Sequence, residues 1–173
     1  AKGTLLDRLK SALGEIRGAY SLCIMGEGCL YGARDSIGVR PLVLGRLRGG
    51  YVLASETCAF DLIEAELLRV VEPGEIVAID QNGLSSRKIK TRNGGKIERC
   101  IFEHVYFARP DSTVFGVPVN ADRSAIGRIL AREAPADCDV VIPVPDSRFY
   151  AAMGYSRESK IAFDMGLVRN NYV

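Results

Sequence analysis

The stretch VVIPVPDSRFYAAMGY, residues 140–155, decides the fold of the second half of the chain. A mostly apolar run over residues 139–144 is typical of a strand buried on both faces, as in a parallel sheet flanked by helices. The residues that follow, 147–158, predict a helix, and residues 167–173 predict the next strand. This succession predicts a β-α-β unit.

The turn between this strand and helix, Pro145-Asp146-Ser147-Arg148, is the strongest candidate site in the sequence. Ligands of open α/β sheets bind beyond the carboxyl ends of the strands, and the start of a helix presents N–H groups that attract anions. Arg148 adds a cation, and the Ser147 hydroxyl can face Mg²⁺ or a phosphate oxygen. The turn therefore predicts a pyrophosphate site; the alternative is that Asp146 or Ser147 only caps the helix.

Arg169 stands two residues into the predicted last strand. In a parallel sheet it is expected to point toward the same crevice as the turn, and the alternative is a solvated surface arginine.

Between these regions and the first half, residues 100–108 form an aromatic, strand-like run. Residues 120–133 predict a helix with Ile126, Ile129 and Leu130 on one face.

The first half predicts a layered α+β arrangement with an antiparallel sheet. Residues 4–17 have helical spacing of leucines, with Thr4 and Asp7 placed as a capping box. Seven short β-type runs follow, separated by glycine turns and by a short helix from Glu56 to about Ala65. Asn82-Gly83 indicates a hairpin, since both residue types tolerate positive φ.

Composition sets the broad class of the chain. It has 173 residues, 47% hydrophobic and 25% charged, and 23 basic against 21 acidic side chains spread along its length. This balance is typical of a soluble protein and shows no nucleic-acid footprint and no membrane-surface patch. Five cysteines without C-x-x-C spacing favour a reducing compartment. We expect a cytoplasmic protein, or a plastid protein if the chain comes from a longer parent protein whose transit peptide is removed.

Isolated candidates for chemistry are weaker than the turn. Cys100 alone does not make a metal site, and His104, the sole histidine, has no serine or cysteine partner nearby in sequence. The segment 34–42 packs two arginines, an aspartate and a glycine turn between strands. It is interpreted as a structural loop and not as a site.

Seven segments in order together resemble the amidophosphoribosyltransferase family. They are GAYSL (18–22), D-x-x-G-x-R-P-L (35–42), YVLASETCAFD (51–61), LRVVEPGE (68–75), CIFEHVYFARPDS (100–112), VVIPVPDS with AAMGY (140–155), and GLVRNNYV (166–173). The resemblance implies that residues 1–97 are the second half of an N-terminal-nucleophile glutaminase domain, an αββα sandwich. It implies that residues 98–173 begin a type I phosphoribosyltransferase domain.

The resemblance also implies an activity. Members of the family release ammonia from glutamine and transfer it to phosphoribosyl pyrophosphate with the help of Mg²⁺, making 5-phosphoribosylamine, the first step of purine synthesis. It further implies purine nucleotides as feedback ligands and a homo-oligomer. The nucleophilic cysteine, the glutamine-specificity loop and the acidic ribose-binding motif have no counterpart in residues 1–173. The chain alone is therefore expected to be inactive, without a catalytic residue, and its gene to extend in both directions.

Residue roles carry over only at matching positions. Pro145, Asp146 and Ser147 match the pyrophosphate loop, with Ser147 at the position associated with Mg²⁺, and Arg169 matches a basic residue near the substrate. Cys100 falls where iron–sulfur members place their first cluster ligand; the cluster is conditional, because members without one also carry cysteine there. Tyr106 and Arg109 match an interdomain hinge.

Two departures from the family pattern keep alternatives open. Arg148-Phe149-Tyr150 stands where the loop usually has small residues, and Asn171 stands where the last strand usually has arginine. The bulky replacement favours, as the main alternative, a non-catalytic nucleotide-binding or subunit-interaction module on the same scaffold. A third alternative is a different phosphoribosyltransferase with an unrelated front half.

Overall fold

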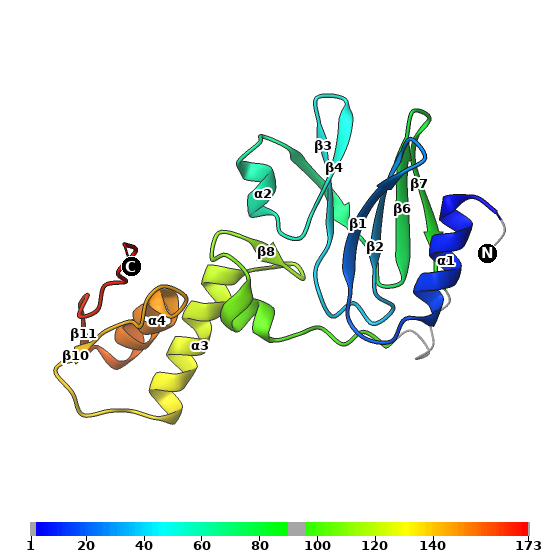
Figure 1. Cartoon of the computed structure of the whole chain (residues 1–173). Helices are drawn as coiled ribbons and strands as arrows, with labels where there is room; N and C mark the ends of the chain where they lie inside the picture. The colour runs from blue at the N-terminus through cyan, green and yellow to red at the C-terminus, as the bar shows by residue number, and fades with distance from the viewer. Residues whose placement is uncertain (1–2, 90–95, 173) are drawn as a thin grey trace. The chain divides into compact units, whose positions relative to one another are not determined.

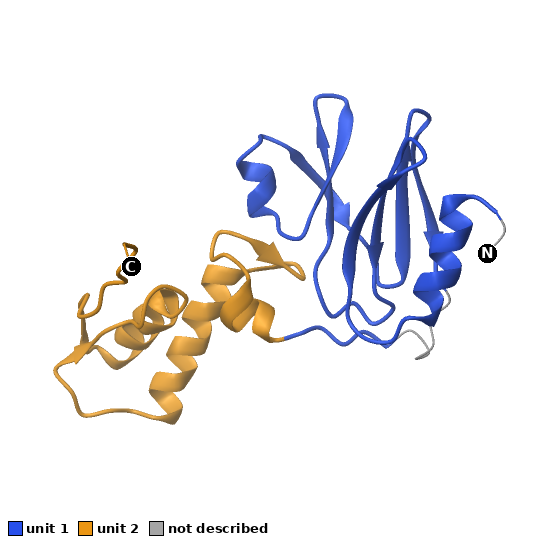
Figure 2. Ribbon diagram, viewed as in Figure 1, with its two compact units in different colours: residues 1–100 blue, residues 101–173 orange. Residues whose placement is uncertain are grey.

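The computed structural model describes residues 3–89 and 96–172 and divides the chain into two compact units, residues 1–100 and 101–173 (Figure 2). The polar segment 90–99, predicted as the boundary between domains, lies mostly outside the described residues. Each unit has its own buried core.

Unit 1 begins with α1, Leu5–Glu15, whose start follows the predicted capping box. The Thr4 hydroxyl accepts the Asp7 amide at 3.3 Å, and the Asp7 carboxylate accepts the Thr4 amide at 3.1 Å. Two of the amides that every helix leaves unpaired at its start are thereby satisfied. The predicted helix is confirmed, and it ends two residues earlier than expected.

Two antiparallel sheets follow α1 in unit 1 (Figure 1). One has four strands in the order β1-β2-β6-β7: Ser21–Gly26, Cys29–Arg34, Glu75–Asp80 and Gly83–Lys88. The other has three strands in the order β4-β3-β5: Gly50–Ala54, Val43–Leu47 and Glu66–Val70. The expectation of antiparallel pairing is confirmed, with two sheets in place of one.

Side chains along β2 and β6 alternate between the two faces of the four-stranded sheet, and this alternation explains how the layers of unit 1 pack. Tyr31 and Ala33 of β2 belong to one buried cluster with Leu13 of α1, whereas Val77 of β6 belongs to a second cluster with Leu44 of the three-stranded sheet. Successive side chains of a strand point to opposite faces, so the four-stranded sheet is covered by α1 on one side and by the other sheet on the other.

Tight hairpins set the register of the sheets. The turn between β1 and β2 consists of Glu27 and Gly28, and both have the positive φ that a two-residue hairpin turn requires. In the β6–β7 hairpin the register places Gln81 and Asn82 in the turn, and Gly83, at φ 110°, is already paired with Asp80. The hairpin is confirmed, but its turn lies one residue earlier than Asn82-Gly83.

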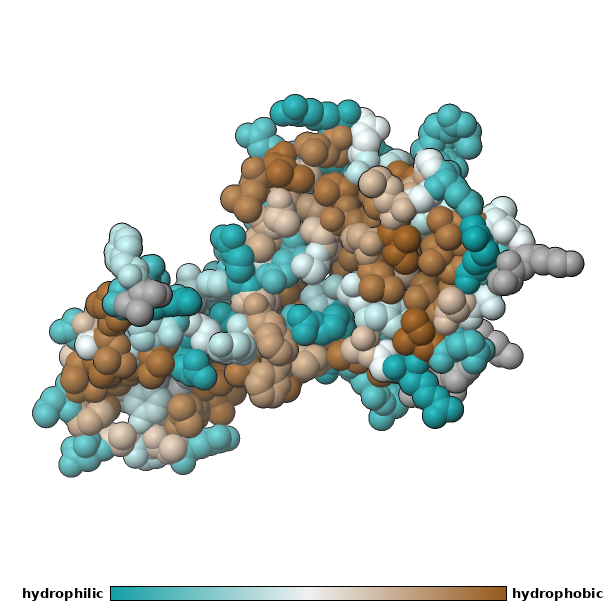
Figure 3. Space-filling view, viewed as in Figure 1, coloured by the Kyte–Doolittle hydropathy of each residue, from teal (hydrophilic) through white to brown (hydrophobic). Residues whose placement is uncertain are grey.

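Helix α2, Cys58–Asp61, is a single turn, shorter than the predicted helix from Glu56 to about Ala65. Phe60 packs into the core so closely that a side chain on Gly45 of β3 would meet its ring. Apolar side chains also remain at the surface over α2 (Figure 3), where Leu62 is 74% exposed. The described residues do not cover this face.

The loop 34–42 is structural, as predicted. The buried Arg34 guanidinium donates to the carbonyl oxygens of Arg40, Val71 and Gly38 at 2.7–2.9 Å. The buried Asp35 carboxylate accepts the amides of Ile37 and Gly38 at 3.0 and 2.7 Å. Both charged groups are therefore used to hold backbone.

Unit 2 is built from one helix pair, a two-stranded parallel sheet, a two-stranded antiparallel sheet and a short π-helix (Figure 1). Its elements in chain order are η1 Glu103–Phe107, β8 Thr113–Val114, β9 Val117–Pro118, α3 Val119–Glu133, β10 Val140–Val141, α4 Phe149–Ser159 and β11 Ala162–Phe163. Strands β10 and β11 pair in parallel, Val140 with Ala162, across α4. A β-α-β unit forms as predicted, but its second strand is β11 and not the predicted strand over residues 167–173.

The strand that completes this unit is not the predicted one. β11 is Ala162–Phe163, and within the described residues 164–172 no strand forms. A strand needs a hydrogen-bonded neighbour, and no described segment pairs with residues 167–172. Arg169 therefore lies in a segment without regular secondary structure, outside the sheet, and the strand predicted over 139–144 is reduced to Val140–Val141.

The aromatic run over residues 100–108, predicted as a strand, is helical. The Ala108 amide donates to the Glu103 carbonyl at 3.0 Å, a wide i→i+5 turn that defines the π-helix η1. The buried Arg123 of α3 donates to the carbonyls of His104 and Ala108 at 2.5 and 2.8 Å. This long-range cap stabilises a conformation that the local β-propensity does not favour.

The predicted helix over residues 120–133 is confirmed as α3, and the face with the predicted apolar residues is not its most buried face. Ile126, Ile129 and Leu130 are 37–50% exposed. The buried positions, one helical turn apart, include Gly127, which approaches the backbone of Ala151 on α4.

Candidate pyrophosphate site

The loop between β10 and α4 is held at both ends. Pro143 is fully buried, and Phe149 at the start of α4 meets the Phe163 ring of β11 edge-on, with centroids 5.3 Å apart. The peptide bond between Pro145 and Asp146 is cis. The segment 145–148 thus projects from a fixed frame at the carboxyl end of β10, where ligands of α/β sheets bind.

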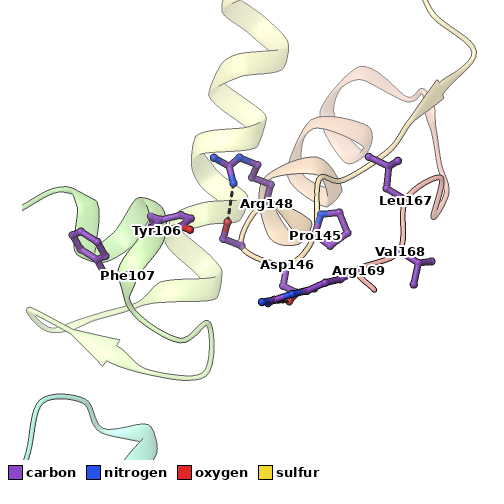
Figure 4. Close-up of a pocket in the computed structure, with 9 residues that line it drawn as sticks. Tyr106, Phe107, Pro145, Asp146, Arg148, Leu167, Val168 and Arg169 are labelled. Atoms are coloured by element: carbon purple, nitrogen blue, oxygen red, sulfur yellow. Dashed lines mark hydrogen bonds and ion pairs between the residues drawn. The ribbon is translucent and has the colours of Figure 1, made fainter. Parts of the chain in front are cut away.

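This loop forms one wall of a pocket of about 710 Å³ (Figure 4). The pocket lies wholly within unit 2 and is lined by three segments, namely Tyr106 and Phe107, Pro145 to Arg148, and Leu167 to Arg169. The structure therefore brings together Pro145, Asp146, Ser147, Arg148 and Arg169, the five residues proposed from sequence to bind substrate.

Charges of both signs face the pocket. Arg169 Nη1 lies 3.3 Å from Asp146 Oδ2, and both side chains are about 70% exposed. Arg148 donates from Nη1 to Ser147 Oγ at 3.1 Å, and its guanidinium lies 5.8 Å from the ring centroid of Tyr106, within the range of a cation–π contact. Two arginines against one carboxylate leave the site positive.

The first turn of α4 is open to a ligand. Its N-cap residue is Arg148, and in the described residues neither Asp146 nor Ser147 forms a side-chain cap. The alternative that these residues only cap the helix is therefore wrong. Helix amides without a side-chain cap, at the positive end of the helix dipole, are suited to bind an anion.

Two predicted residues lie away from this pocket. Arg109 forms a two-point ion pair with Asp111, with Nε–Oδ1 and Nη2–Oδ2 distances of 3.1 and 2.7 Å. Cys100 is half-buried, and its amide donates to the Val39 carbonyl at 3.3 Å. Tyr106, predicted as a hinge residue, also lines the pocket, and its hinge role stays a prediction.

Sequence reasoning missed the apolar walls of the pocket, Phe107, Leu167 and Val168. The signal was present in part, since Phe107 belongs to the aromatic run that was interpreted as a strand. An alternating strand pattern would turn Tyr106 and Phe107 to opposite faces, whereas the helical turn places both at one pocket.

The family resemblance implies two inorganic groups, Mg²⁺ and an iron–sulfur cluster, and the described residues fit the first better than the second. Mg²⁺ bound through substrate phosphates needs only one or two protein oxygens, which Asp146 and Ser147 provide. Among the described residues no three His, Cys, Asp or Glu side chains gather as a metal site, so Cys100 alone does not fit an iron–sulfur cluster.

Comparisons with known proteins agree with this fold. Two solved structures match with 41% identity: glutamine phosphoribosylpyrophosphate amidotransferase from B. subtilis complexed with ADP and GMP (TM-score 0.92, covering 99% of this chain and 37% of the other), and an allosteric regulatory enzyme of purine biosynthesis (TM-score 0.93, 100% and 37%). The fold of this chain thus matches the 37% of each of these structures that it covers.

Curated relatives give the same family. Amidophosphoribosyltransferase of Mycobacterium tuberculosis is 47% identical over 173 residues, which is 100% of this chain and 32% of the relative. The chloroplastic enzyme of Glycine max is 48% identical over 169 residues, 97% of this chain and 29% of the relative. No family model matches.

The chain is related over its whole length to amidophosphoribosyltransferases, and it spans about a third of their length. The family resemblance predicted from the seven motifs is therefore confirmed. Because the match includes the first unit, the alternative of an unrelated front half is wrong.

Proposed function

We propose that the chain is part of an amidophosphoribosyltransferase and that the pocket at the start of α4 binds the diphosphate of phosphoribosyl pyrophosphate. The observation that carries this proposal is the meeting of Arg148, Arg169 and the start of α4 around one cavity at the end of a parallel strand. A diphosphate matches the charge and the N–H donors of this site.

Unit 1 supplies the second part of the proposal. Two face-to-face antiparallel sheets with α1 on one outer face and α2 packed by Phe60 against the other support an αββα glutaminase domain, with residues 1–97 assigned to it and 98–173 to the transferase domain. Its substrate is glutamine, whose amide nitrogen the whole enzyme delivers as ammonia.

Each side chain of the site has a role in the proposed reaction. Ammonia forms a C–N bond to C1 of the ribose as the C–O bond to pyrophosphate breaks, giving 5-phosphoribosylamine. Arg148, Arg169 and the α4 amides hold the departing charge, which is the main demand of this chemistry. Asp146 and Ser147 would hold Mg²⁺, which would supply further charge neutralisation when bound.

The remaining assignments follow the family. Purine nucleotides are proposed as feedback ligands, supported by the ADP and GMP in the B. subtilis enzyme. A homo-oligomer is proposed, and so is an iron–sulfur cluster where other parts of the parent protein complete the ligand set of Cys100. A cytoplasmic or plastid location is proposed, the second supported by the chloroplastic relatives. None of the helices in the described ranges is long and apolar enough to cross a membrane.

Titration of the chain with pyrophosphate, with and without Mg²⁺, tests the proposal when amide NMR shifts are followed. Shifts are expected at residues 145–150 and 169, and Ser147→Ala and Arg169→Ala should weaken binding several-fold. Arg109→Ala is the matched control, because Arg109 pairs with Asp111 outside the pocket. An unchanged spectrum over 145–150 at saturating pyrophosphate and Mg²⁺ rules out this site.

The same titration distinguishes the proposed pyrophosphate site from the main alternative. Arg148 stacks on Tyr106 and donates a hydrogen bond to the Ser147 hydroxyl oxygen. This contact competes with binding of Mg²⁺ by the hydroxyl and therefore favours a non-catalytic nucleotide-binding module. Such a module should bind ADP or GMP at these residues without a Mg²⁺-dependent response to pyrophosphate.

A further inference from the structure

We infer that His104 and Asp122 are positioning residues, and that their contact fixes the short helix that carries the aromatic wall of the pocket beside α4. That wall is formed by Tyr106 and Phe107, both in the π-helix η1 (Figure 4). His104 belongs to the same helix, and no step of the proposed reaction uses it. The inference rests on the proposed function for its effect on pyrophosphate binding, whereas the contact itself is measured without ligand.

His104 meets Asp122 between two elements of unit 2. Its Nδ1 atom lies 3.0 Å from Asp122 Oδ2, in the first turn of α3, and the imidazole is only 9% exposed. An ionised carboxylate only accepts hydrogen bonds, so a hydrogen on Nδ1 is required beside it. The N–H is not aligned for a straight hydrogen bond, and the contact is therefore mainly electrostatic. Removing the carboxylate leaves a buried polar atom without this partner, which is costly.

The side chain at position 104 adds to η1 what its backbone contacts do not provide. Arg123, the residue after Asp122 on α3, donates to the carbonyls of His104 and Ala108, and any residue at position 104 keeps these bonds. The Phe115 ring of the β8–β9 turn lies 6.0 Å from the imidazole, tilted by 39°. The backbone of η1 is thus anchored by Arg123, and the imidazole sets how η1 is turned on this anchor.

A change in η1 reaches the pocket directly. A five-residue helix has little stability of its own, so tertiary contacts decide its position. Tyr106 packs edge-on against Phe107, with ring centroids 5.9 Å apart, and its ring lies 5.8 Å from the Arg148 guanidinium (Figure 4). Arg148 is a proposed ligand of pyrophosphate. His104 therefore acts on the site through Tyr106, without touching the ligand.

Two amide substitutions separate this contact from simple packing of the ring. His104→Asn places a side-chain N–H close to the position of Nδ1, whereas His104→Gln places its amide near the position of Nε2, farther from the backbone. Pyrophosphate binding should weaken about tenfold in His104→Gln, the effect of losing one contact to a charged group, and less than about threefold in His104→Asn. Packing alone predicts no such rescue, since both variants lose the ring. Helix propensity predicts the opposite order, because glutamine is the better helix former.

Asp122→Ala completes the test as a double-mutant cycle. It should weaken binding about as much as His104→Gln, and the combined variant should lose little more, because both changes break one contact. Glu133→Gln is the control, since it removes a carboxylate from an exposed position of the same helix. Without ligand, hydrogen exchange of the Ala108 amide, which donates to the Glu103 carbonyl at 3.0 Å, should speed up in His104→Gln and Asp122→Ala and stay near its original rate in His104→Asn.

The two measurements keep the inference and the proposed function apart. Equal exchange rates in His104→Asn and His104→Gln, or independent effects in the cycle, overturn the inference even if the unchanged chain binds pyrophosphate. If the exchange pattern is found and the unchanged chain does not bind pyrophosphate, the proposed function fails, and the contact still positions the aromatic wall. Circular dichroism checks that each variant remains folded.

Discussion

Gly127 of α3 lies directly against the carbonyl group of Ala151 on α4, so closely that an added Cβ would overlap the carbonyl oxygen and carbon. Gly154 of α4 stands in the reciprocal position against the Ser124 carbonyl of α3. Because backbone atoms occupy both places, the helix pair has no side chain that can move aside. The stability of unit 2 depends on this contact.

Gly127→Ala should therefore destabilise unit 2. Alanine is about 1 kcal/mol better than glycine inside a helix, but forcing backbone segments apart in a packed interface costs about 1–3 kcal/mol or more. We expect a net loss of about 2 kcal/mol, measured by urea unfolding together with hydrogen exchange of the α3 and α4 amides.

Gly14→Ala is the control for that substitution. Gly14 is also inside a helix, α1, and a Cβ there would meet only the Ile89 side chain at 3.8 Å, an ordinary contact. This variant should be neutral or stabilised by up to about 1 kcal/mol. A similar loss in both variants would contradict the proposed role of the helix contact.

A second prediction concerns acid stability of unit 1. Glu75 is buried and accepts two hydrogen bonds from Arg69, each at 2.8 Å, and one from the Glu72 amide at 2.8 Å. Burial raises the pKa of Glu75, but the Arg69 hydrogen bonds, the Glu72 amide and the Arg69 charge outweigh it, so the pKa is lower than its ordinary value.

A carboxyl whose pKa is depressed by folding stabilises the protein above its unfolded pKa, about 4.3 for glutamate, and loses that contribution as pH falls through the folded pKa. Glu75→Gln should cost about 2 kcal/mol at pH 7, since hydrogen bonds to a charged group contribute about 1.5–3 kcal/mol. The difference from the unchanged chain should shrink below pH 4.3 in urea titrations. Glu66→Gln, at an exposed position of β5, is the control for removing one carboxylate charge from this unit.

The sequence was most informative where local chemistry alone sets the structure. The capping box at Thr4 and the strand-turn-helix at residues 140–155 could be predicted because their hydrogen bonds and packing involve near neighbours. The five loop and strand-end residues of the candidate pocket followed from a general rule on where α/β sheets bind ligands.

Long-range contacts account for what the sequence did not predict. Residues 100–108 have the β-branched and aromatic composition of a strand, but Arg123, far along the chain, donates to their carbonyls and holds a helical turn. On α3 the isoleucines form an obvious apolar stripe, yet the packed position is Gly127, whose value lies in the missing side chain. Neither effect can be inferred from periodicity.

A third prediction concerns the start of α1. Thr4→Ala removes the hydroxyl that accepts the Asp7 amide, and loss of an N-cap side chain costs about 1 kcal/mol. Thr4→Ser keeps the acceptor and should retain most of the stability. Urea unfolding of both variants checks the prediction, and equal losses for alanine and serine would show that the hydroxyl is not what stabilises the helix.

The last prediction concerns Arg148, the departure from the family pattern that now lies inside the proposed pyrophosphate site. Arg148→Gly removes a cation and also frees the Ser147 hydroxyl from the hydrogen bond at 3.1 Å. Without Mg²⁺, pyrophosphate binding should weaken about tenfold, the effect of losing one charge-assisted hydrogen bond. With Mg²⁺ the loss should be smaller, because the freed hydroxyl can bind the metal. Calorimetric titrations at two salt concentrations measure both effects, and binding by the glycine variant should depend less on salt. If Arg148→Gly binds pyrophosphate as tightly as the unchanged chain without Mg²⁺, Arg148 is not a ligand of the anion.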